Sequence, residues 1–192
     1  MSRIPGRESG DPRFFGLVPT LGRGDLPLAL LDGESLVSLA TSALTSAGGA
    51  SLEADVTWAA ARDGGLTVVL HDPLCPLTPG WFIEEAIADA TESVVVVGVR
   101  PVTDTIKTVT GAVVGDTVDR DSLWTVTSPV VLPPAVAFAL TDEPDLTDFA
   151  AFVTSLRGQF EVVFVEAPSL GRRVADIPDV LLLEAFARAQ RI

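Results

Sequence analysis

The chain has 192 residues, a formal net charge of −13 and a hydrophobic fraction of 47%. This length predicts one domain with a sizeable core, and the hydrophobic fraction excludes a disordered chain. The acidic excess opposes a nucleic-acid surface, because phosphate backbones require clustered cations.

Other features of the whole chain indicate the cellular compartment in which we expect the protein. The single cysteine, Cys75, excludes an internal disulfide. The longest near-continuous apolar run, Val94–Val99, is too short to cross a bilayer, and the first residues lack the apolar core of a signal peptide. We therefore expect a cytoplasmic protein with neither nucleic-acid nor membrane partners.

In chain order, residues 1–13 are polar and predict a flexible lead, followed by one domain over residues 14–192. The elements expected next are a first strand in Phe14–Pro19, a turn at Asp32-Gly33, a helix from the N-cap Ser35 to Gly48-Gly49, a helix over Ala54–Ala61 and a strand at Leu66–Leu70. The continuous apolar character of that strand is typical of one buried on both faces of a parallel sheet.

The second half continues the alternation. The expected elements are a helix over Thr78–Ala90, a strand at Val94–Val99, a helix near Leu146–Leu156, a strand at Glu161–Val165 and an amphipathic helix over Pro178–Arg191, with Leu181, Leu182, Ala185 and Ala189 as its apolar positions. Strands that alternate with helices predict a three-layer α/β domain with a mainly parallel sheet.

Residues 101–127 interrupt this alternation. The segment holds the chain's only lysine, Lys107, and a second cation, Arg120. Two β-prone runs flank Gly115-Asp116, which predicts a tight turn between antiparallel strands. Either its charges are simply solvated or the segment is an arm that needs a partner surface, since a strand pair alone is marginal in water.

Asp72 directly follows the apolar strand at Leu66–Leu70 and is expected at the carboxyl edge of the sheet. A carboxylate there can hold Mg²⁺ beside a polyphosphate. The alternative is an aspartate that only initiates the turn before Pro73.

Two linked segments resemble the 2-C-methyl-D-erythritol 4-phosphate cytidylyltransferases: Pro101–Lys107 with Thr117–Arg120, and Val69–Asp72. The resemblance implies a Rossmann-like nucleotidyltransferase fold with a protruding β-arm, and transfer from CTP with Mg²⁺ on Asp72. It also implies a homodimer in which the arm hooks around the second subunit. Thr105, Lys107 and Arg120 would then hold the sugar phosphate.

The nucleotide side departs from the family pattern. Leu28 stands where the family has a lysine after its Gly-rich loop, and Cys75 stands where it has an arginine. Leu52 and Asp55 similarly replace an arginine and a serine. Arg23 is the residue that would substitute for the arginine of the loop, the alternative being a surface glycine turn.

Arg173 falls on a family lysine, the alternative being a basic pair before a helix. The departures favour a non-catalytic dimeric binding or scaffold protein without a cofactor, with an unidentified protein as a further partner. The alternative is an active cytidylyltransferase that binds CTP and a sugar phosphate, with Mg²⁺ at Asp72, a rearranged loop, and Arg23 and Arg173 as catalytic cations.

Overall fold

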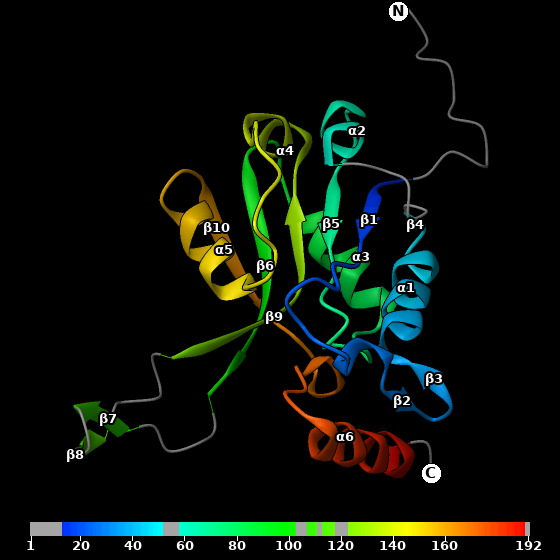
Figure 1. Ribbon diagram of the computed structural model, residues 1–192. Helices are drawn as coiled ribbons and strands as arrows, with labels where there is room; N and C mark the ends of the chain where they lie inside the picture. The colour runs from blue at the N-terminus through cyan, green and yellow to red at the C-terminus, as the bar shows by residue number, and fades with distance from the viewer. Residues whose placement is uncertain (1–12, 52–57, 103–106, 111–112, 118–122, 191–192) are drawn as a thin grey trace, which may run out of the picture.

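The computed structural model describes residues 13–51, 58–102, 107–110, 113–117 and 123–190 (Figure 1). A six-stranded sheet in the order β10-β6-β9-β5-β1-β4 forms the centre. Its strands are β1 (Phe15–Leu17), β4 (Ala50–Ser51), β5 (Val68–Leu70), β6 (Val94–Pro101), β9 (Trp124–Leu132) and β10 (Glu161–Glu166).

Strand directions in the sheet are mixed. β1 runs parallel to β4 and β5, and β10 runs parallel to β6. β9 lies between β5 and β6 and is antiparallel to both. The expected mainly parallel α/β fold is confirmed, although β5 has a parallel neighbour on one side only.

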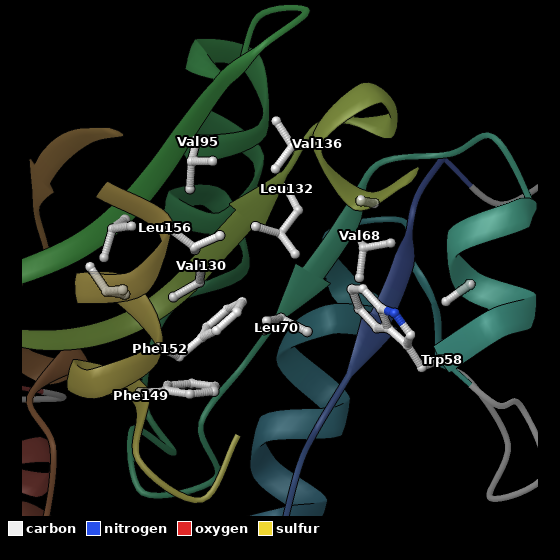
Figure 2. Close-up of a cluster of buried hydrophobic side chains, with 14 of the residues drawn as sticks. Trp58, Val68, Leu70, Val95, Val130, Leu132, Val136, Phe149, Phe152 and Leu156 are labelled. Atoms are coloured by element: carbon white, nitrogen blue, oxygen red, sulfur yellow. The ribbon is translucent and has the colours of Figure 1, made fainter. Parts of the chain in front are cut away.

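Helices cover both faces of the sheet. The helices of the described chain are α1 (Leu36–Ser46), α2 (Trp58–Asp63), α3 (Gly80–Asp89), α4 (Pro134–Ala139), α5 (Phe149–Arg157) and α6 (Ile177–Gln190), with short 3₁₀ turns η1 (Leu26–Leu28) and η3 (Ser169–Gly171). Of these, α6 packs on a separate cluster beside β2 and not on a face of the sheet. One buried cluster joins α2, α4 and α5 to the sheet (Figure 2), and a second joins α1 and α3 to it. These two clusters create the three predicted layers.

The central strands supply both clusters because successive side chains point to opposite faces. Val68, Leu70 and Val95 belong to the cluster under α2, α4 and α5, whereas Val69 and Val96 belong to the one under α1 and α3. A continuous apolar run is therefore required in strands that are covered on both sides.

Local signals in the first half behave as predicted. Asp32 and Gly33 both have positive φ and connect the hairpin of β2 (Leu30–Leu31) and β3 (Glu34–Ser35). Ser35 caps α1, since its Oγ accepts a hydrogen bond from the Ser38 N–H at 3.2 Å. The helix ends before Gly48, whose φ is also positive.

Two local predictions are wrong. Gly115 and Asp116 lie inside β8 (Val113–Thr117), which pairs with β7 (Lys107–Thr110), so they do not form the turn of the hairpin. Helix α6 buries Val180, Leu183 and Ala187 instead of the four predicted positions. Its sequence is apolar on several sides, so the spacing of leucines alone could not select the buried one.

No helix in the described part of the chain is long and apolar enough to cross a membrane.

Candidate functional site

Three segments meet at one edge of the sheet. Asp72 follows β5, Arg23 lies in the segment between β1 and η1, and Arg173 follows β10 and η3. The carboxyl ends of β1, β5 and β10 share one edge because these strands run in the same direction. The fold thereby brings together the three residues on which the sequence placed catalytic and metal-binding roles.

The Asp72 carboxylate lies between two guanidinium groups. Its Oδ1 accepts a hydrogen bond from Arg23 Nε at 2.7 Å, and its Oδ2 accepts one from Arg173 Nε at 3.1 Å. The Leu74 N–H also donates to Oδ1 at 3.1 Å. With only 1% of its side chain exposed, the carboxylate obtains its charge compensation from inside the protein.

The guanidinium of Arg23 is hydrogen-bonded to protein groups. Its side chain is 2% exposed, and Nη1 donates to the carbonyl oxygens of Leu21 at 2.8 Å and Leu146 at 2.9 Å. The guanidinium carbon also lies 5.1 Å from the centre of the Phe149 ring. These contacts tie the loop after β1 to the end of β5 and to the start of α5.

Arg173 is different because 37% of its side chain is exposed. Its Nε holds Asp72, and the described part of the chain gives its two Nη groups no hydrogen bond or ion pair. Arg173 therefore keeps the capacity to meet an anion from solvent.

The backbone of Asp72 is fixed from β9. Its N–H donates to Ser128 Oγ at 2.7 Å. Gly98 of β6 permits this placement of β9, since a Cβ there would collide with the Ser128 carbonyl. Sequence reasoning did not assign Ser128, Leu146 or Phe149 to the site, although Ser128-Pro129 lies at the position of a family Thr-Pro pair.

The fold agrees with comparisons to known proteins. The family model of 2-C-methyl-D-erythritol 4-phosphate cytidylyltransferase matches residues 32–188. The chain belongs to this family.

Relatives of the same description support the assignment. The cytidylyltransferase of Syntrophotalea carbinolica is 34% identical over 128 residues, covering 64% of this chain and 54% of the relative. That of Bacillus velezensis is 30% identical over 128 residues, covering 64% and 55%. The chain spans about half the length of the curated relatives it matches.

Solved structures show the same fold. The cytidylyltransferase of Thermus thermophilus superposes with a TM-score of 0.65 at 22% identity, covering 91% of this chain and 98% of that one. The Anaerococcus prevotii enzyme, named as a 4-diphosphocytidyl-2C-methyl-D-erythritol synthase, gives 0.63 at 15% identity, covering 93% of this chain and 100% of that one. The Rossmann-like nucleotidyltransferase fold is thus confirmed.

The resemblance to the family implied Mg²⁺ at Asp72. With the side chains in their observed positions, the surroundings of Asp72 do not fit this ion. Mg²⁺ requires a nearly octahedral set of oxygen ligands. Both Asp72 oxygens already accept hydrogen bonds from guanidinium groups, whose positive charges oppose a cation at the same carboxylate. A magnesium ion would have to compete with Arg23 or Arg173 for Asp72.

Burial keeps the two other reactive side chains beside Asp72 unreactive. Burial lowers the pKa of His71 to about 4, against the opposing influence of the Asp72 carboxylate. Burial also raises the pKa of the Cys75 thiol, the Asp72 charge adds to this rise, and Arg173 and Ser128 partly offset it. At neutral pH the site therefore contains a neutral imidazole and a protonated thiol.

Most residues on the sugar-phosphate side of the family pattern fall outside the described part of the chain. Thr105 and Arg120, like Leu52 and Asp55, lie outside the described residues. Of Lys107 the structure describes only the backbone, which begins β7. Their roles at an anion remain predictions.

Proposed function

We propose that this chain is a cytidylyltransferase family member that has lost nucleotidyl transfer and acts as a homodimeric binding or scaffold protein. The observation that carries the proposal is the pairing of both Asp72 oxygens with Arg23 and Arg173. A carboxylate with both oxygens paired, and a guanidinium as buried as that of Arg23, are not free to hold a metal and a phosphate.

The charge around the site supports the same conclusion. A triphosphate carries about four negative charges, so a transferase must aim donors and cations at it. Leu28, at the position of the family lysine, is 66% exposed and apolar, and Cys75, at the position of a family arginine, is a buried thiol. Loss of one preorganised electrostatic contact typically slows an enzyme by about a hundredfold or more.

The arm supports the dimeric part of the proposal. β7 and β8 pair with each other and belong to a two-stranded sheet separate from the central one. A two-stranded hairpin is marginal in water without further packing, so a second subunit is the surface we expect it to meet. Lys107 and Arg120 would then approach the partner's site and support binding of a phosphate-bearing ligand.

The test is release of pyrophosphate from CTP and methylerythritol phosphate with excess Mg²⁺, run beside a calorimetric titration of CTP–Mg²⁺. We expect no turnover above that of an Asp72→Ala variant, and weak or undetectable CTP binding. Robust turnover that Asp72→Ala abolishes would refute the proposal. It would instead establish the alternative, an active enzyme with a metal on Asp72 and a rearranged loop.

A further inference from the structure

Helix α6 is apolar around most of its circumference, yet only one side of it is buried. Val180, Leu183 and Ala187 are buried, and the first two pack into the cluster beneath the helix. The outward positions include large apolar side chains, which are Ile177 (52% exposed), Leu181 (58%), Leu182 (56%) and Phe186 (42%). Because a helix that is hydrophobic all round is normally buried, the outward side is expected to be covered in the working protein.

The apolar surface extends from α6 onto a neighbouring turn. α6 lies at one end of the molecule beside β2 (Figure 1). Its first residue also lies near η1, because residues of both elements line the same hollow. An open hollow of about 470 Å³ lies between η1 and the start of α6. The apolar residues that line this hollow are Leu26, Leu28, Ala29, Ala175 and Ile177. We call these residues, together with the exposed Leu181 one helical turn after Ile177, the α6 groove.

The charges around the α6 groove are acidic. Asp25 and Asp176 line the hollow, and no lysine or arginine of the described chain does so. Arg188, a cation further along α6, is engaged by Asp32 at 2.7 Å and Glu184 at 2.7 Å. A binding partner must therefore bring both apolar side chains and positive charge.

We propose that the α6 groove binds an amphipathic helix of another protein whose polar side carries lysine or arginine. A helix laid into an apolar groove places side chains at i, i+3, i+4 and i+7 in contact, which suits a groove bounded by Ile177 and Leu181 at i, i+4 spacing. A second copy of this chain suits it less well, since its own Asp25 and Asp176 would meet the same carboxylates. The inference does not depend on whether nucleotidyl transfer is lost.

The experiment uses a fluorescent peptide of about 18 residues, with leucine and lysine at helical spacing, titrated with the full chain and followed by anisotropy. We expect the double variant Ile177→Ser/Leu181→Ser to bind at least about tenfold more weakly. Asp25→Asn/Asp176→Asn should also weaken binding, more so at low salt. Phe138→Ser is the matched control, because Phe138 is 68% exposed on α4, outside the groove, and its loss should change nothing.

Three results would overturn the proposal. Equal binding of the peptide by the wild type and by Ile177→Ser/Leu181→Ser, with both folded by circular dichroism, would show that net charge alone attracts it. Sedimentation showing that the wild type self-associates and that this double variant does not would make a second copy the occupant. A peptide with serine in place of every leucine should bind at least about tenfold more weakly than the parent peptide, and equal binding would again count against the groove.

Discussion

Replacing Arg23 with alanine should be among the most destabilising changes available outside the apolar core. The substitution removes the Nε bond to Asp72 Oδ1 and two Nη1 bonds to backbone carbonyls, all from a side chain that is 2% exposed. It leaves Asp72, which is 1% exposed, with Arg173 as its one remaining cation in the described part of the chain. Breaking a buried ion pair on one side typically costs about 3–5 kcal/mol of the free energy of unfolding, and we expect a loss in that range.

Two comparison variants distinguish the effect of breaking the buried ion pair from the effect of losing a charge in general. Arg173→Ala also removes a guanidinium from Asp72, but that side chain is 37% exposed and its bond is longer at 3.1 Å. Solvent screening should limit its cost to about 1 kcal/mol or less. Arg23→Leu combined with Asp72→Leu should recover much of the loss, since no buried charge is then left uncompensated.

Urea unfolding followed by far-UV circular dichroism measures all of these variants. If Arg23→Ala lowers the free energy of unfolding by less than about 1 kcal/mol, the prediction is wrong, because removing one partner of a buried ion pair should be more destabilising than that. Such a result would mean that the loop after β1 is open in solution and that Asp72 is free to meet a ligand.

Three further predictions follow from buried groups and from the arm. Cys75 should react with a thiol-specific reagent only as the chain unfolds, because burial raises its pKa, and rapid labelling of the folded protein would contradict this. The free energy of unfolding should fall as the pH drops from 6.5 towards 4, by up to about 1.4 kcal/mol per pH unit, because the unfolded chain protonates His71 and the folded one does not until about pH 4. His71→Leu should remove that part of the slope, and an identical pH profile for wild type and variant would exclude His71 as its source. Light scattering at micromolar concentration should give twice the chain mass, and a mass that stays monomeric as concentration rises would rule out the arm-mediated homodimer.

Those parts of the fold that local chemistry specifies were predictable. β6 begins with a run of four valines and β10 has an apolar centre, and the hairpin at Asp32-Gly33 and the cap at Ser35 use residues whose backbone preferences are strong. Each of these signals acts within a few residues. The sequence therefore contains the information without reference to the rest of the chain.

The parts that failed depend on contacts distant in sequence. β9 lies between β5 and β6 and is antiparallel to both, a position that the local pattern of Trp124–Leu132 does not reveal. The buried side of α6 is chosen by what lies beneath it, Leu31, Leu36 and Val174 among others, because the helix offers apolar residues on several sides.

The candidate site divides in the same way. Asp72 could be placed at the carboxyl edge because it follows an apolar strand, and the resemblance indicated Arg23 and Arg173 one at a time. Both arginines bind the same carboxylate, although one is 49 positions and the other 101 positions away from Asp72 in the sequence. Neither spacing nor motif predicts this arrangement. Phe149 beneath the Arg23 guanidinium carries no sequence signal at all.

The stability of the Arg23 pair bears on the affinity for nucleotide. A magnesium nucleotide that approaches Asp72 at Oδ1 meets Arg23, so this approach requires a form of the protein in which Arg23 has left its buried position. If that form lies about 3–5 kcal/mol above the closed one, the apparent affinity falls by about 10²–10⁴-fold relative to an open site. We therefore expect a large loss of stability in Arg23→Ala to accompany absent CTP binding, and a small loss to accompany measurable binding. A large loss together with tight CTP binding would show that the nucleotide binds without displacing Arg23, either beside the exposed Arg173 or away from Asp72.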